Sequence, residues 1–495
     1  MKLNPNILAG CILLLSLAIT VIPASAAPHW PSVEQIRNVV DETFFDLANG
    51  PGCAVGIQHE GNTIFTKGFG YTDVESKDPI TDTTLFNIAS MSKQFTVLAI
   101  LKLQSQGLLS VNDPVKKFIP EITESHSSIQ ISDLIHHTSG LMDYLGYFWF
   151  AGIRDFSQLS RETALHAMFG ESIQVSATGR HWAYNNGGYL LLAEIVTRVS
   201  GQNFENFARK NVLLPFAMDN SYFRSLDDPD LGPIAHGYVQ TPNGLIEQTD
   251  TVNYSGDGGL ITNIQQFLKY TAAMHSNRGL WNKKNAEFIT TPAKLDGPEM
   301  FSETGTLDTT YGGGLGLQQL NGHLAYTHTG GIAGYNSNFA YFPDNGLAIV
   351  AFCNLRHANL KQRFEKVYEL YFNQTTSKTK NSEQSRPPEN QEQLAPALLL
   401  TSLEGQYSSE QLRTIYEFKV NEKGGVILSI SSPFIPKPLV QEFSKILLTA
   451  DGLIALTPSF IRVRVMLTES GKVKTFKLVS PITPAFEFQR ITHHK

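Results

Sequence analysis

The stretch Phe86-Asn87-Ile88-Ala89-Ser90-Met91-Ser92-Lys93-Gln94-Phe95-Thr96 joins a turn of small residues to a helical apolar pattern. Phe95 and Leu98 lie at helical spacing, which predicts a helix beginning near Ser90, with Lys93 one turn later on the same face. A serine becomes a nucleophile when a base lies within hydrogen-bond reach, and burial can lower the pKa of a lysine enough for that role. Taken alone, S-x-x-K is by default an N-capping serine with a solvated lysine.

The composition is that of an ordinary globular protein. The chain has 495 residues, 42% hydrophobic and 17% charged, enough for two or three domains. A formal net charge of -6 gives no indication of a nucleic-acid partner. The sequence has no C-x-x-C or H-E-x-x-H spacing, so it signals no metal site.

Residues 1–26 resemble a secretory signal peptide in composition. Lys2 is basic, Ile7–Ile22 is apolar, and Ala24-Ser25-Ala26 is a small-x-small cleavage site. We therefore expect an exported protein, periplasmic or secreted, with no integral membrane segment in its mature form. The alternative is an uncleaved anchor, because the apolar run approaches the roughly 18 residues that a spanning helix needs.

Strand patterns lie near both ends of residues 27–372, and helical patterns lie between them. The expected strands are 53–59, 63–70, 311–319, 323–328 and 335–353, the last broken by a turn at 343–346. The expected helices are 33–47, Ser90 to Gly107, 190–199, 265–274 and 359–371. Residues 110–230 look mainly helical, with loops at 144–150 and 227–233. This order predicts an α+β fold with one sheet made from the two ends and a helical part inserted.

The composition changes abruptly at Asn373, and residues 373–398 are expected to form a polar linker. Beyond it the pattern alternates with period two, most clearly at 461–465 and 473–478. Further strand-like runs lie near 414–420, 425–430, 445–450 and 486–491. Residues 399–495 are therefore predicted to form a small all-β domain, an antiparallel barrel or sandwich.

Two cysteines remain once Cys11 leaves with the signal peptide. Cys53 and Cys353 both lie in apolar, strand-like runs. An exported compartment would permit a disulfide, but cysteine also packs well as a small apolar group. We expect two buried free thiols.

Two further motifs offer groups that could act with a serine and a lysine. Tyr184 and Asn186 flank one residue at the start of a helical run, where a phenol can relay a proton and an amide can hold a lysine. The alternative is an aromatic turn packed on the core. His328-Thr329-Gly330-Gly331 ends a strand, and glycines at a strand edge let a substrate approach the backbone N–H groups. The alternatives are a partly exposed strand histidine and a tight turn.

The adjacent histidines His136 and His137 end a short helical run. Adjacent residues point to different sides of a helix, and we expect a structural role at the helix end. The alternative is that one of them is a ligand or a base.

In order, these stretches resemble the class C β-lactamase, D-alanyl-D-alanine carboxypeptidase and esterase-like group of serine hydrolases (peptidase family S12) over about residues 33–372. The motifs are Ser90 to Lys93, His137-Thr138-Ser139-Gly140-Leu141, Tyr184-Asn185-Asn186, Gly256-Asp257-Gly258-Gly259-Leu260 and His328-Thr329-Gly330. The resemblance implies an antiparallel sheet flanked by helices with an inserted helical subdomain. Residues 399–491 are similar to the lipocalin-like domain that often follows such domains.

The resemblance also implies an acyl-enzyme mechanism without a cofactor. Ser90 would be the nucleophile, Lys93 its base and Tyr184 the proton relay. Asn186 would position substrate and lysine, and the backbone N–H groups of Ser90 and Gly331 would form the oxyanion hole. Residues that bind substrate would be Asn186, His328, Thr329, Gly330 and Gly331. The substrate would be an ester or amide, with D-amino-acid and cell-wall peptides as candidates.

One departure concerns substrate charge. His328 stands where β-lactamases and many carboxypeptidases have the lysine of K-T-G, and a histidine with an unperturbed pKa of about 6.5 is mostly neutral at pH 7. Efficient β-lactam turnover is therefore doubtful. A class C-like β-lactamase and a catalytically inactive penicillin-binding-type protein are the alternatives.

Overall fold

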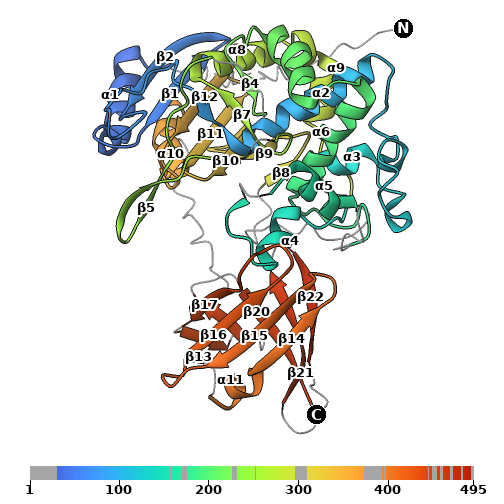
Figure 1. Cartoon of the computed structure of the whole chain (residues 1–495). Helices are drawn as coiled ribbons and strands as arrows, with labels where there is room; N and C mark the ends of the chain where they lie inside the picture. Colours follow the sequence, from blue (N-terminus) through green and yellow to red (C-terminus); the bar gives the residue numbers. More distant parts are fainter. Residues whose placement is uncertain are drawn as a thin grey trace, which may run out of the picture.

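The computed structural model describes residues 30–491 with internal gaps. The gaps are 157–158, 170–175, 226–230, 251, 253, 296–308, 373–392, 395–396, 444, 449–453, 458–460, 469–471 and 481–482. The expected signal peptide and nearly all of the expected linker lie outside the described residues. The described part forms a larger body, from α1 to α10, and a smaller one built from the strands coloured orange to red (Figure 1).

A seven-stranded antiparallel sheet forms the framework of the larger body, with the strand order β2-β1-β12-β11-β10-β9-β8. The strands are β1 (Cys53–His59), β2 (Asn62–Phe69), β8 (Thr309–Tyr311), β9 (Gly316–Leu320), β10 (His323–Ile332), β11 (Tyr335–Phe342) and β12 (Leu347–Cys353). Because β1 pairs with β12, the two ends of this region build one sheet, as predicted. The α+β architecture with inserted helices is confirmed.

Helices cover both faces of this sheet. α1 (Val33–Phe44) and α10 (Leu360–Tyr371) share one apolar cluster with the sheet, while α8 (Ile264–His275) packs on the other face (Figure 1). β12 is buried along its whole length, as its unbroken apolar sequence requires. α1 begins with a capping box, in which Ser32 and Gln35 each accept the other's backbone N–H.

The inserted region is mainly helical, and α2 runs through its core. Its α-helices are α2 (Lys93–Ser105), α3 (Ile131–Ile135), α4 (Tyr144–Phe150), α5 (Arg161–Phe169), α6 (Asn186–Ser200), α7 (Phe204–Ala208) and α9 (Lys283–Ile289). Short strands β3 (Phe86–Asn87), β7 (Leu260–Thr262) and β4 (Tyr222–Phe223) form a small sheet in that order. A hairpin of β5 (Tyr238–Thr241) and β6 (Gly244–Glu247) projects from this body (Figure 1).

The expected loop at 144–150 is wrong, because this segment is helix α4. The carboxylate of Asp143 caps the helix by accepting the N–H of Leu145. The helix reads YLGYFWF, so it has no polar face and therefore no amphipathic period for a sequence pattern to detect.

The prediction of two free thiols is also wrong. Cys53 and Cys353 form a disulfide between β1 and β12. They are directly paired across the two antiparallel strands, with Cα atoms 4.0 Å apart. Their separation of 300 residues hid this pairing, because only the strand register brings them together.

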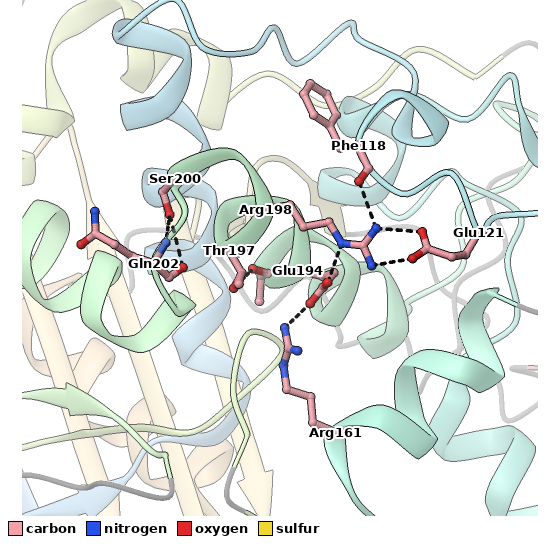
Figure 2. A network of polar contacts seen from close by, with 9 residues as sticks. Phe118, Glu121, Arg161, Glu194, Thr197, Arg198, Ser200 and Gln202 are labelled. Carbon is pink, nitrogen blue, oxygen red and sulfur yellow. Dashed lines mark hydrogen bonds and ion pairs between the residues drawn. The ribbon is translucent and has the colours of Figure 1, made fainter.

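An ion-pair network fixes α6 to its neighbours (Figure 2). Glu194, which is 7% exposed, accepts from Arg161 of α5 and from Arg198 one turn further along α6. Arg198 also makes a bidentate pair with Glu121, with N–O distances of 2.7 and 2.9 Å. α6 matters for the site because its first residue is Asn186.

The smaller body is a ten-stranded antiparallel sheet, with α11 (Ala397–Leu403) between its first two strands in the chain. Its strands, in chain order, are β13 (Gln393–Leu394), β14 (Gly405–Ser409), β15 (Thr414–Val420), β16 (Val426–Ser431), β17 (Leu439–Phe443), β18 (Lys445–Leu448), β19 (Ile454–Thr457), β20 (Ile461–Leu467), β21 (Val473–Ser480) and β22 (Thr483–Arg490). The sheet order is β13-β18-β19-β20-β21-β22-β14-β15-β16-β17. β17 and β18 are consecutive in the chain yet stand near opposite edges, so the sheet must curl until these edges approach. Its likeness to a lipocalin stays a prediction.

Candidate active site

Ser90 lies in a 3₁₀ turn, η2 (Ala89–Ser92), immediately before α2. Ala89 has a φ of +49°, a left-handed conformation that costs energy for a residue other than glycine. The turn is held by hydrogen bonds from both sides: Asn87 Oδ1 accepts the Ala89 N–H at 2.9 Å, and Ser337 of β11 donates to the Ile88 carbonyl at 2.8 Å. Neighbouring strands therefore fix the serine.

Lys93 is completely buried one turn after Ser90, as the sequence predicted. Its Nζ lies 3.1 Å from Ser90 Oγ, 2.8 Å from Asn186 Oδ1 and 2.5 Å from the Asp257 carbonyl oxygen. Three acceptors match the three N–H groups of an ammonium ion and aim the nitrogen at the serine.

Burial also sets the charge of this lysine. Desolvation lowers the pKa of Lys93 to about 8, although the negative charges of Asp257 and Asp143 partly oppose it. At pH 7 roughly one Lys93 side chain in ten is therefore the neutral amine, and at pH 8 about half are. A neutral amine 3.1 Å from a hydroxyl is a competent general base.

Tyr184 and Asn186 approach the same lysine from the start of α6. Asn185 caps this helix by accepting the N–H of Gly188 at 2.8 Å, so Tyr184 precedes the helix and Asn186 opens it. The ring centre of Tyr184 lies 4.9 Å from Lys93 Nζ. Burial raises the pKa of Tyr184 well above 10, and its interaction with Ser90 only partly offsets this, so the phenol is protonated at neutral pH. Such a phenol can relay a proton, but in the resting enzyme it is not a deprotonated general base.

The His328-Thr329-Gly330-Gly331 stretch lies on β10 beside the serine turn. β9 pairs with β10 only from His323 to Thr327 in the described part, so the following half of β10 has a strand edge. A Cβ added to Gly330 would lie 2.2 Å from the Ile88 carbonyl oxygen. Only glycine lets the strand approach the serine turn this closely.

His328 is a buried, neutral imidazole. Its Nδ1 lies 2.6 Å from the Thr329 carbonyl oxygen, which can only accept, so this nitrogen carries the proton. Nε2 therefore accepts from the hydroxyl of Tyr311 at 3.0 Å. Burial, followed by the nearby charge of Lys93, lowers the pKa of His328 to about 3. The histidine thus brings no positive charge to this strand.

His137 packs within a cluster of aromatic rings beside the site, and its structural role stays a prediction. Its ring packs on Tyr184, Tyr189 and Tyr311, with ring centres 4.4, 5.1 and 4.7 Å away. Its Nδ1 accepts the Asn185 N–H at 3.1 Å. Burial lowers the pKa of His137 well below its usual value, which keeps the imidazole neutral among the rings.

Four polar side chains at the site were not predicted as site residues. Asp143 accepts from Asn186 Nδ2 at 2.7 Å, and Tyr144 donates to Asp257 Oδ2 at 3.1 Å. Tyr311 bonds His328. Asp257 had a signal, since it lies in the Gly256–Leu260 motif, and Tyr311 begins the expected strand 311–319, although nothing in that strand pattern marked it as a site residue. Asp143 and Tyr144 lie in a segment without any helical or strand period.

The described residues include no group of three or more His, Cys, Asp or Glu side chains that could hold a metal ion. Within the same part of the chain, every helix is too short or too polar to cross a bilayer.

Two curated proteins are similar to this chain in sequence. Penicillin-binding protein 4* of Bacillus subtilis (strain 168) is 27% identical over 308 residues, which are 59% of this chain and 66% of that protein. A D-aminopeptidase of Brucella anthropi is 22% identical over 313 residues, covering 62% and 56%. The chain therefore spans two thirds or less of these curated relatives.

Solved structures share the fold. The octameric penicillin-binding protein homologue from Pyrococcus abyssi matches with a TM-score of 0.57 at 22% identity, over 92% of this chain and all of that one. The D-amino acid amidase from Ochrobactrum anthropi SV3, complexed with D-phenylalanine, has a TM-score of 0.57 at 20% identity, over 68% of this chain and 98% of that one. The family described as Beta-lactamase matches residues 40–372. Because this match spans well over half of the 495 residues, the chain belongs to the beta-lactamase family.

Proposed function

We propose that this protein is an exported serine hydrolase that forms an acyl-enzyme on Ser90. The observation that carries the proposal is the 3.1 Å contact between Ser90 Oγ and the Nζ of a fully buried Lys93. A solvated lysine beside an N-capping serine, the default for this motif, would have neither the burial nor the lowered pKa. Relatives named as penicillin-binding protein and D-aminopeptidase support the assignment.

In the first half-reaction, Ser90 Oγ attacks the carbonyl carbon of an ester or amide while its proton passes to the neutral amine of Lys93. The carbonyl oxygen becomes an oxyanion, which the backbone N–H groups of Ser90 and Gly331 would stabilise. The intermediate then collapses and expels the alcohol or amine, which takes a proton through Tyr184. In the second half-reaction, water activated by the same groups releases the acid and restores Ser90.

The substrate class follows from charge. With His328 neutral, this position offers no cation for a substrate carboxylate. Neutral esters and amides, including amides of D-amino acids, therefore fit the site better than penicillins do. The similarity to a D-aminopeptidase points the same way.

The test is intact-mass spectrometry of the purified protein with a neutral activated ester, with hydrolysis followed in parallel. We expect an acyl adduct that maps to Ser90 and turnover that Ser90→Ala abolishes. Ser105→Ala is the matched control, because this hydroxyl lies at the exposed end of α2 and bonds only the Lys102 carbonyl. Undiminished ester hydrolysis by Ser90→Ala would show that another group is the nucleophile.

A β-lactamase or D-alanine-type peptidase is the second candidate, and Arg356 favours it. A Cβ on Gly331 would lie 2.5 Å from Arg356 Nη1, so the guanidinium lies directly against the strand that would bind substrate. Nη1 is buried, and none of the described residues forms a hydrogen bond with it. This cation could replace the missing lysine as a carboxylate-binding group.

Arg356→Gln separates the two candidates. If the natural substrate has a carboxylate, the variant should lose acylation by penicillin while keeping hydrolysis of the neutral ester. Equal rates for both reagents in the parent and the variant would remove this second candidate. A lasting penicillin adduct without turnover of any ester or amide would instead favour the inactive, penicillin-binding alternative.

A further inference from the structure

We propose that the C-terminal sheet is a positioning element of the catalytic site, acting through helix α4 on the groups that hold Lys93. The inference rests on the proposed function, because it concerns the same lysine. α4 lies where the larger body meets the C-terminal sheet (Figure 1). Its two ends contact different parts of the protein, and each contact is specific.

The C-terminal end of α4 is capped by the other domain. Tyr416 of β15 donates its hydroxyl to the Phe150 carbonyl at 2.7 Å, and Ser432 donates to the Ala151 carbonyl at 2.6 Å. The last carbonyls of a helix have no partner within the helix itself. Here two side chains from more than 260 residues away satisfy them.

Aromatic packing strengthens the same contact. Phe434 lies edge-on against Tyr147 and Phe148 of α4, with ring centres 6.0 and 5.2 Å apart. Phe150 packs on Phe486 at 5.5 Å and belongs to the apolar core of the C-terminal sheet. The helix is therefore shared between two cores.

The N-terminal end of α4 contacts two of the three residues that accept from Lys93, Asn186 and Asp257. Asp143, its N-cap, accepts from Asn186 Nδ2 at 2.7 Å, and Asn186 Oδ1 accepts from Lys93. Tyr144, its first residue, donates to the carboxylate of Asp257, whose carbonyl oxygen accepts from Lys93. A shift of this seven-residue helix would move both acceptors together.

The surroundings of Lys93 make the effect measurable. The titratable groups that act on the ammonium or face it are the carboxyls of Asp143 and Asp257, the phenols of Tyr184 and Tyr189, and the imidazoles of His137 and His328. Two of these six, Asp143 and Asp257, are held by α4. Displacing α4 should therefore change both the rate of acylation and its dependence on pH.

The interior of the C-terminal sheet favours a positioning role for this domain over the binding of a ligand inside the sheet. Tyr416 and Phe476 both pack on Phe488, with ring centres 4.4 and 4.5 Å away, and Tyr407 packs on Phe476 at 5.0 Å. All four side chains are completely buried. In the described part of the sheet these rings therefore pack against one another as a core.

The experiment compares Tyr416→Phe with Tyr407→Phe in the full chain. Each substitution removes one buried hydroxyl that donates to a backbone carbonyl, but the Tyr407 hydroxyl donates to Leu403 within its own domain, whereas the Tyr416 hydroxyl donates to Phe150 of α4. We expect Tyr416→Phe to lower kcat for ester hydrolysis by about threefold to tenfold and to shift the pH profile, with KM nearly unchanged. Tyr407→Phe should leave both unchanged. Ser432→Ala should reproduce the Tyr416→Phe effect from a less buried position.

A double variant tests the route. Asp143→Asn weakens the hydrogen bond that holds Asn186. In this background Tyr416→Phe should therefore lower kcat by a smaller factor than it does in the parent protein. Equal kinetics of Tyr416→Phe, Ser432→Ala and Tyr407→Phe would overturn the inference, provided that circular dichroism shows all three folded. Absence of Ser90-dependent turnover in the parent protein would instead overturn the proposed function, so the two failures are distinguishable.

Discussion

Lys93 gives the site its expected response to pH. Its pKa is lowered to about 8 by burial, and only the neutral amine accepts the serine proton. The kcat/KM for a neutral ester should therefore rise as the pH increases through about 8 and level off above it. A pH profile measured in constant ionic strength checks this. A profile that falls between pH 7 and 9 would contradict Lys93 as the base.

Asp257 tests the same assignment from the other side. Its negative charge raises the pKa of Lys93, so Asp257→Asn should move the rising limb of the profile to lower pH. The matched control is Asp133→Asn, a partly buried carboxyl, which accepts from Gln130 and Thr138 and is not among the charges acting on Lys93. If the rising limb of the pH profile stays at the same pH in Asp257→Asn, a group other than Lys93 controls the rate.

The sequence predicted the contact of Ser90 with Lys93 because a helical period fixes which side chains share a face. It also singled out Tyr184 and Asn186, and the structure brings both to the lysine. Asp143 and Tyr311 were out of reach, since they meet their partners only through the packing of segments distant in the chain.

At the scale of elements, the ion-pair network around α6 is expected to contribute to stability more than to catalysis. Glu194→Gln would leave Arg161 and Arg198 without their shared carboxylate. We expect the free energy of unfolding to fall by about 1–3 kcal/mol, with kcat little changed. Glu124→Gln is the control, because its pair with Lys116 is exposed and should matter little. Urea unfolding of both variants measures the difference. Equal urea midpoints for Glu194→Gln and Glu124→Gln would contradict the prediction.

Elements with a clear period were predictable, and those without one were not. α1, β1 and β2 follow their sequence patterns to within a residue or so at most boundaries. α4 was missed because its sequence has no polar face, and the helix packs against the cores of both domains. The short strand β14 was missed for a different reason: its sequence, GQYSS, is mostly polar.

At the scale of the molecule, the disulfide joins the first strand of the sheet to the last. Both cysteines are fully buried, so replacing Cys353 with Ala should lower the free energy of unfolding by about 2–5 kcal/mol. Peptide mapping without reduction should recover the 53–353 cross-link, and thermal unfolding should show the loss. A parent protein that unfolds at the same temperature with and without reductant would contradict this.

The pairing of β1 with β12 also has a consequence for the order in which the chain is made. Cys53 leaves the ribosome 300 residues before its partner. At about 5–20 residues per second, that interval is roughly 15–60 seconds. Throughout it, β1 has only β2 as a neighbour, and its other edge is open to any strand that arrives. The helices around Ser90 can collapse early, but the strand that supports the serine turn through Ser337 comes near the end of this wait. Whatever shields the free edge of β1 during synthesis therefore governs how much chain reaches the native sheet.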